Sequence, residues 1–116
     1  MKKIGIIGSR RRDSKEDYAL CEKKFFEIYE KGDEIVSGGC PKGGDSFADF
    51  IAEIYNIPIT VHKANWDLGR HAGFLRNGDI ARDSDVLICV VHEDRTGGTE
   101  DTIAKAEKLG KKIILV

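Results

Sequence analysis

The apolar residues of the chain gather in five short runs that are separated by longer segments of mixed character. Each run is nearly continuous rather than alternating, a pattern typical of strands that are covered on both faces of a parallel sheet. In the third run the β-branched residues Ile, Thr and Val follow one another and favour extended backbone. The sequence therefore predicts five strands, over Lys3–Gly8, Glu34–Ser37, Ile59–His62, Asp85–Val91 and Ile113–Val116.

The segment after the first strand has the periodicity of a helix. Its apolar side chains recur at a spacing that places them on one face: Tyr18, Cys21, Phe25 and Ile28. Ser14, with Asp17 three residues later, has the pattern of a helix N-cap. Gly32 suits the position just past a helix end. We therefore expect a helix from Ser14 to about Lys31.

Three further helices are expected, over Asp45–Tyr55, Ala72–Ala81 and Thr99–Leu109. The first of them carries an apolar stripe of Phe47, Phe50, Ile51 and Ile54. A longer connection, Ala64–Gly73, precedes the second, and Gly110 ends the last. Strands and helices thus alternate along the whole chain.

This alternation predicts an α/β fold with a doubly wound, five-stranded parallel sheet in the order 3-2-1-4-5 and helices on both faces. Residues 1–116 would form one domain, and no repeat or linker interrupts them. In this topology the strand order reverses between strands 1 and 4. Ligands bind at the carboxyl ends of the strands at such a switch point.

Glycine-rich and polar segments fall at that edge, and they supply the candidate binding residues. The candidates are Gly8, Ser9, Arg10, Ser37, Gly38, Gly39, Gly43, Asp45, Trp66, Arg70, Arg76, Asn77, Gly97, Gly98 and Thr99. Two of these segments, Ser37–Asp49 and Thr96–Thr99, have glycines between a strand and a helix, an arrangement that aims backbone N–H groups at an anion. We expect both loops to face one site, although a plain turn capped by Thr99 is the alternative for the second.

Several candidates have a structural alternative. Asp45 suits the N-cap of its helix. Arg10 is the best placed of three consecutive arginines to clamp a phosphate, whereas Arg11 and Arg12 fit a solvated charge run equally well. Arg76 either reaches a phosphate or lies on the surface. Trp66 either stacks on a base or plugs the space beneath a long loop.

Composition narrows the class of protein. The net charge of −1 gives no general attraction to nucleic acid or to an anionic membrane. No apolar run is long enough to span a bilayer. Three cysteines without CxxC spacing fit a reducing cytoplasm, with Cys21 and Cys89 in the core and Cys40 in the first glycine loop. The three histidines show no metal-ligand spacing, and neither a dinucleotide fingerprint nor a P-loop is present, so no cofactor is expected.

The chain resembles a known superfamily. SGGCPKGGDSFADFIA is similar to the SGG-x-x-GxD-x-x-A segment of the SLOG superfamily. The segments HKANWDLGRHAGFLRNGDIARDSDVLICVV and TGGTEDTIAKAEKLGKKI resemble its YspA, cpYpsA-related branch. This resemblance implies a Rossmann-like fold, a pocket for a nucleotide or nucleotide-derived small molecule, and a homodimer or higher homo-oligomer.

Relatives within the superfamily imply three functions. The first is binding of a nucleotide-derived molecule, for sensing or sequestering. The second is hydrolysis of nucleoside 5′-monophosphates, as in the Lonely Guy phosphoribohydrolases; by that resemblance Arg76 would hold the phosphate, and Asp101 or Glu100 would polarise the ribose or the attacking water. The third is single-stranded DNA binding, as in the DNA-processing protein DprA, which the charge balance and the scarcity of interleaved aromatics disfavour.

Overall fold

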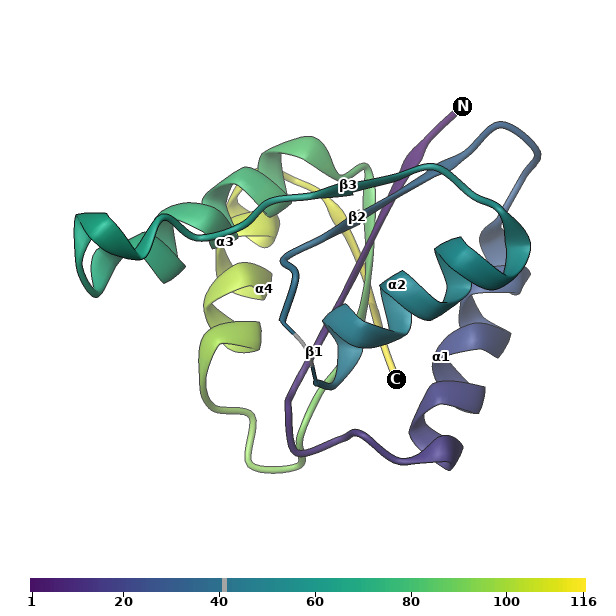
Figure 1. The fold of residues 1–116 in the computed structure, drawn as a ribbon, viewed down its shortest axis with the longest axis horizontal. Coiled ribbons are helices and arrows are strands. Elements are labelled where there is room, and N and C mark those ends of the chain that lie inside the picture. Colours follow the sequence, from purple (N-terminus) through teal and green to yellow (C-terminus); the bar gives the residue numbers. More distant parts are fainter. Residues whose placement is uncertain (41) are drawn as a thin grey trace.

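A computed structural model describes residues 1–40 and 42–116 (Figure 1). The elements are, in chain order, β1 (Lys3–Gly8), α1 (Lys15–Ile28), β2 (Glu34–Ser37), α2 (Gly44–Tyr55), β3 (Ile59–Val61), the 3-10 helix η1 (Trp66–Leu68), α3 (His71–Asp83), β4 (Val86–Val90), α4 (Gly98–Lys108) and β5 (Lys112–Leu115). Every predicted strand and helix is present. The short helix η1, within the long connection, was not predicted.

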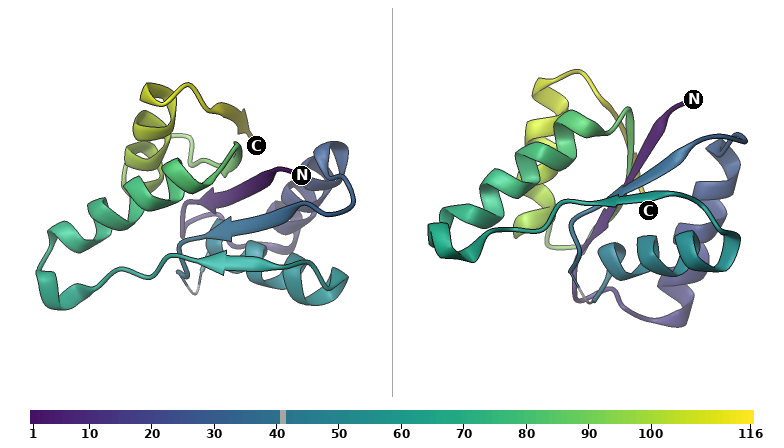
Figure 2. Two further views of the ribbon diagram at one scale, coloured as in Figure 1. Left: turned by 90° about the horizontal axis from the view of Figure 1, so that it is seen from above. Right: turned by 45° about the horizontal axis from the view of Figure 1, so that its top comes forward.

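The strands form one parallel sheet in the order β3-β2-β1-β4-β5, which confirms the predicted topology. β1 lies at the centre, with Ile4 beside Ile35 of β2 and Val86 of β4. Helices α1 and α2 cover one face of the sheet, and α3 and α4 cover the other (Figures 1 and 2). The fold is therefore the Rossmann-like three-layer arrangement.

Each face of the sheet has its own apolar core. Ile4 and Ile6 of β1 point toward α1 and α2, where Phe25 and Ile51 are also fully buried. Ile7, at the next position along β1, points to the other face, with Leu87, Cys89, Ile80 and Ile103. Because successive side chains of a strand point to opposite faces, an unbroken apolar run fills both cores.

Helix α1 begins as predicted and ends earlier than predicted. Ser14 accepts the Asp17 N–H at 3.0 Å, and the Asp17 carboxylate accepts the Ser14 N–H at 3.3 Å, so a capping box is formed. The helix stops at Ile28 rather than Lys31. The cause lies in Asp33, whose carboxylate accepts the N–H of Glu30 at 2.9 Å and so holds that residue out of the helical ladder.

The apolar stripe predicted for α2 is only half correct. Phe47 and Ile51 are buried against the sheet, but the side chains of Phe50 and Ile54 are 53% and 61% exposed. The contact with the sheet is completed by the small residues Ala48 and Ala52, which are also buried. Phe50 instead meets the edge of Tyr18 on α1, with ring centroids 6.1 Å apart.

The connection between β3 and α3 projects away from the body of the molecule. Helix η1 and the first turns of α3 extend beyond the edge of the sheet (Figure 2). Helix α3 runs over His71–Asp83 and is longer at both ends than predicted. Across the part of the chain that the structure describes, no helix combines the length and apolarity needed to cross a bilayer.

Candidate functional site

Three chain segments meet in backbone contact at the carboxyl edge of the sheet. A Cβ atom placed on Gly43 would lie 2.2 Å from the carbonyl oxygen of Ser9, and one on Gly44 would lie 2.2 Å from the carbonyl carbon of Ile7. At Gly8 the added atom would lie 2.9 Å from the carbonyl oxygen of Val90. Glycine is therefore required at these positions for the packing of β1 against α2 and β4, because any side chain would force the backbones apart.

A cavity of about 820 Å³ opens at this edge, where the strand order reverses between β1 and β4. Its size falls within the range of small-molecule sites. The predicted residues that line it are Gly8, Ser9, Arg10, Gly38, Gly39, Asp45, Trp66, Arg76, Asn77, Gly97, Gly98 and Thr99. Both glycine loops thus face one cavity, as predicted from their positions after β2 and β4.

Five predicted site residues lie outside the cavity lining: Ser37, Gly43, Arg70, Glu100 and Asp101. The Ser37 side chain is fully buried, and its hydroxyl donates to the Asp45 carbonyl at 3.4 Å. Gly43 packs against Ser9, and its N–H donates to the carboxylate of Asp13 at 2.8 Å. Arg70 is exposed at the start of α3. Glu100 and Asp101 are engaged in ion pairs with Arg95 and Lys105.

The N-terminus of α4 offers unshared hydrogen-bond donors to the cavity. Gly97 occupies the N-cap position with φ 96°, and no side chain caps the helix. Within the described part of the chain, no acceptor is bonded to the N–H groups of Gly98 and Thr99. These groups and the positive end of the helix dipole favour an anion. Thr99 is not the cap of this turn, because Gly97 occupies the N-cap position and Thr99 lies inside the helix.

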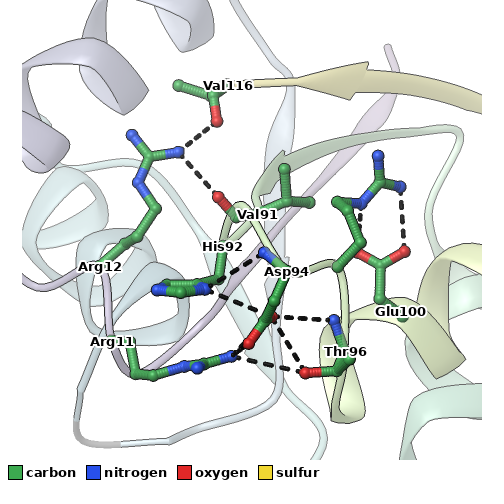
Figure 3. A network of polar contacts seen from close by, with 9 residues as sticks. Arg11, Arg12, Val91, His92, Asp94, Thr96, Glu100 and Val116 are labelled. Atoms are coloured by element: carbon green, nitrogen blue, oxygen red, sulfur yellow. Dashed lines mark hydrogen bonds and ion pairs between the residues drawn. The ribbon is translucent and has the colours of Figure 1, made fainter.

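The loop before α4 is held by Asp94 (Figure 3). Its carboxylate pairs with Arg11 at 2.7 Å and accepts the N–H and the hydroxyl of Thr96 at 3.2 and 3.0 Å. The hydrogen bond from Arg11, assisted by Thr96 and His92, lowers the pKa of Asp94 to about 2. The carboxylate therefore stays charged at neutral pH, and it joins the exit of β1 to the exit of β4.

Arg76 and Asn77 of α3 connect the two glycine loops. Arg76 Nη1 donates to the Gly38 carbonyl at 2.6 Å, and its Nε donates to the Asn77 side-chain oxygen at 3.1 Å. Asn77 Nδ2 in turn donates to the Gly98 carbonyl at 3.3 Å. Asn77 is only 6% exposed, so its side chain is held by these partners. Arg76 is thus a cavity residue, and its alternative placement on the open surface is wrong.

Asp45 lies at the base of the cavity and is not a helix cap. The N-cap of α2 is Gly43, whose φ of 72° suits glycine, and Asp45 is the second residue of the helix. Its Oδ2 accepts the N–H of Cys40 at 3.1 Å. Burial raises the pKa of Asp45 to about 6, although the Cys40 N–H and the charge of Arg76 oppose this. The group titrates close to neutral pH.

Glu100 and Asp101 are engaged in ion pairs. Arg95 Nε and Nη2 bind the two oxygens of Glu100 at 2.7 and 2.9 Å (Figure 3). Asp101 Oδ2 accepts from Lys105 Nζ at 2.7 Å and from Asn77 Nδ2 at 3.1 Å. Both carboxylates therefore face neighbours on or beside α4, and neither lines the cavity.

Trp66 lies at the rim of the cavity on η1. It is 66% exposed, so the prediction that it plugs the space beneath a loop is wrong. The edge of its ring faces Gly73, where an added Cβ would lie 3.3 Å from the indole. An exposed indole with one side supported by the chain can stack on a planar ligand.

The three consecutive arginines have three different environments. Arg10 is exposed, lines the cavity, and has no acidic partner among the described residues. Arg11 pairs with Asp94 at the rim. Arg12 binds Asp17 at 2.9 Å. It also donates to the Val91 carbonyl at 3.0 Å and to the Val116 carbonyl (Figure 3). A solvated charge run is therefore wrong for Arg12, which ties the exit of β1 to the residues that directly follow β4 and β5.

Eight further residues line the cavity but were not predicted as binding residues: Ile7, Arg11, Cys40, Lys63, Ala64, Ile80, Thr96 and Thr102. Lys63 and Ala64 could have been included, since they directly follow the strand predicted to end at His62. Ile80 and Thr102 have no such signal, because they look like ordinary helix residues. Among the described residues no cluster of three or more His, Cys, Asp or Glu side chains could hold a metal ion.

The fold and the site define a class: an α/β protein with a Rossmann-like sheet and a polar cavity at the switch point of its strands. No protein-family model matches the chain, and no solved structure matches it significantly. The chain is 30% identical over 122 residues to the Gene 61 protein of Mycobacterium phage D29, with 98% of this chain and 95% of that protein aligned. The chain belongs to the family of that phage protein.

Proposed function

We propose that this protein binds a nucleotide or a nucleotide-derived small molecule, which it senses or sequesters. The observation that carries the proposal is the cavity at the β1–β4 switch point, into which the uncapped N-terminus of α4 opens. Open α/β sheets bind their ligands at this position, and helix N-termini bind phosphate.

The charges around the cavity favour an anionic ligand. Arg10, Arg11, Lys63 and Arg76 line it, against one carboxylate, that of Asp45. In this proposal a phosphate binds the N–H groups of Gly98 and Thr99, and the base stacks on Trp66. The separation of a charged end from an exposed aromatic ring matches the two parts of a nucleotide.

The resemblance to the YspA branch of the SLOG superfamily gives independent support, because it implies the same kind of ligand in a cytoplasmic homo-oligomer. The enzymatic alternative, hydrolysis of nucleoside monophosphates, receives less support from the geometry. Its candidate carboxylates, Asp101 and Glu100, form ion pairs outside the cavity lining. Binding without hydrolysis is therefore the preferred function, and single-stranded nucleic-acid binding is disfavoured by the net charge of −1.

Thermal unfolding with AMP, ADP, ADP-ribose, NAD and cyclic nucleotides tests the proposal. A ligand at about 100 times its Kd adds roughly 2.7 kcal/mol to the free energy of unfolding, which raises the melting temperature measurably. The same mixtures are assayed for released base. A melting shift without base release is expected. Base release that Asp101→Asn abolishes would instead establish the enzyme, and the absence of any shift would refute the proposal.

Two exposed aromatic residues, one on η1 and one in the first turn of α3, provide a matched pair of variants. Trp66→Ala is expected to weaken nucleotide binding, because it removes the stacking surface at the rim. Phe74→Ala removes an aromatic that is 54% exposed on α3 but lies outside the cavity lining, so binding is retained. An equal loss of nucleotide affinity in both variants would show that Trp66 does not contact the ligand. Light scattering after gel filtration tests the proposed homo-oligomer.

A further inference from the structure

A second hollow opens beside the main cavity and is strongly basic. Its volume is about 470 Å³, and it is lined by Arg10, Arg11, Cys40 and Lys42. The first three of these also line the main cavity, so the two spaces are adjoining. Lys42 belongs to the hollow alone, whereas the glycines at the start of α4 belong to the main cavity alone.

The charges of this hollow are only partly compensated. Asp94 pairs with Arg11 at 2.7 Å and fixes its guanidinium. Within residues 1–40 and 42–116, no carboxylate pairs with Arg10 or Lys42. Cationic side chains that converge on one hollow repel one another, and they raise the local concentration of anions.

We propose that this hollow is a second anion subsite, and that the ligand is a nucleotide with two or more phosphate groups rather than a nucleoside monophosphate. One phosphate binds the N-terminus of α4, and a second lies between Arg10 and Lys42. The inference rests on the proposed function and names the class of ligand within it. The second phosphate is either the terminal group of a nucleoside diphosphate or the far half of a pyrophosphate bridge.

Cys40 gives a direct readout of the subsite, because it lies at the junction of the two spaces. Its side chain is half-buried, whereas Cys21 and Cys89 are fully buried. Burial also raises the pKa of both core thiols to about 12. A thiol reagent applied to the folded protein will therefore modify Cys40 selectively. The variant Cys40→Ser, which loses this reaction, identifies the site of labelling.

The test is isothermal titration of the whole protein with AMP, ADP, ADP-ribose and inorganic pyrophosphate. We expect ADP or ADP-ribose to bind at least about tenfold more tightly than AMP, as a charge-assisted contact would provide. The two ligands distinguish a terminal phosphate from a bridging one. We also expect the tighter ligand to slow the modification of Cys40 more than saturating AMP does, because Cys40 lines both spaces.

Two matched pairs of variants locate the effect. Lys42→Gln and Arg10→Gln are expected to remove most of the preference for ADP or ADP-ribose over AMP, and Lys42→Gln leaves AMP affinity unchanged. The controls are Lys23→Gln on α1 and Arg70→Gln at the start of α3, exposed residues outside both spaces. Equal losses in the variants and their controls would indicate a general field of charge and overturn the subsite.

The other outcomes separate this inference from the proposed function. If AMP binds as tightly as ADP and ADP-ribose, the second subsite is refuted and the nucleotide site stands. If the preference exists but Lys42→Gln does not reduce it, the second phosphate lies elsewhere and the assignment of the hollow fails. If none of the nucleotides binds, the proposed function and this inference both fail.

Discussion

The guanidinium of Arg76 and the carbonyl of Gly38 are joined by a hydrogen bond of 2.6 Å that links α3 to the loop after β2. Gly38 leaves just enough room for it. A Cβ atom on Gly38 would lie 3.0 Å from Arg76 Nη1 and 2.9 Å from Asp45 Oδ2. The two charged groups of the cavity base therefore approach the backbone at a position where any added side chain would have to displace them.

Gly38→Ala is predicted to destabilise the protein by about 1–3 kcal/mol, the usual cost of forcing extra atoms into a packed site. Urea unfolding measures the effect. Gly98→Ala is the control, because its added Cβ would lie 3.9 Å from Asn77 Nδ2, an ordinary contact, at the first position of α4. A Gly38→Ala protein as stable as the Gly98→Ala protein would show that the base of the cavity adapts to the extra atom.

Asp45→Asn is predicted to change how stability depends on pH. The folded protein holds the pKa of Asp45 at about 6, above its unfolded value of 3.8, so it binds more protons than the unfolded chain between these values. Stability from this group is therefore lost as pH rises from about 4 to about 6, by on the order of 3 kcal/mol in total. The wild type is expected to lose this stability as pH rises over this interval, whereas Asp45→Asn is not. The unfolding free energy of Asp45→Asn is therefore expected to rise relative to that of the wild type. A constant difference would contradict the raised pKa.

Asp33→Asn is predicted to destabilise the turn between α1 and β2. The Asp33 carboxylate is 2% exposed and accepts the Lys2 N–H at 2.8 Å and the Lys2 ammonium at 2.6 Å. Burial by itself raises its pKa, but the hydrogen bonds from Lys2 outweigh burial, and the pKa is lowered. The loss is expected to be about 1–3 kcal/mol, the cost of leaving buried hydrogen-bonding groups without a partner, because Lys2 itself is partly exposed.

The pH dependence of this turn has the opposite sign to that of Asp45. Because the folded pKa of Asp33 is depressed, its contribution is complete above the unfolded value of 3.8 and is lost as pH falls through the folded value. The destabilisation caused by Asp33→Asn is therefore predicted to shrink below about pH 4. Urea unfolding at neutral and acid pH measures it, and a cost that stays constant into acid would contradict the ion pair.

Trp66, the one tryptophan of the sequence, is predicted to report on the cavity. Since it is 66% exposed, its fluorescence without ligand is expected at the long wavelength of a solvated indole and to be quenched by acrylamide. A nucleotide stacked on the ring will reduce both the emission and the access of acrylamide. Saturating nucleotide that leaves the spectrum unchanged would place the base elsewhere.

Much of the fold could be predicted because each local signal agreed with the topology. The unbroken apolar run of β1 implied burial on both faces, and the Ser14 and Asp17 pair marked the start of α1. The ends of elements could not be predicted where a side chain from elsewhere in the sequence sets them. Asp33 ends α1 by capturing the Glu30 N–H, and no periodic pattern reveals that contact.

For the site, the sequence predicted which segments line the cavity but not which side chains form hydrogen bonds or ion pairs with one another. Chain order places the ends of β1 and β4 together, so the lining by Gly8 and Gly98 could be anticipated. The direction of each charged side chain could not. Asp45 reaches back to the Cys40 N–H, a contact that depends on the course of the loop backbone and that sequence spacing does not determine. The pair of Asp101 and Lys105 is different, because their i,i+4 spacing on α4 is one that predicts an ion pair.

The backbone contacts at Gly8, Gly43 and Gly44 have a consequence for how this family can diversify. They fix the shape of the cavity through main-chain atoms, whereas part of its lining consists of exposed side chains such as those of Arg10 and Trp66. Substitutions at the exposed positions can therefore change the chemistry of the cavity at little cost in folding. A protein of this architecture can acquire a new specificity while keeping the same scaffold.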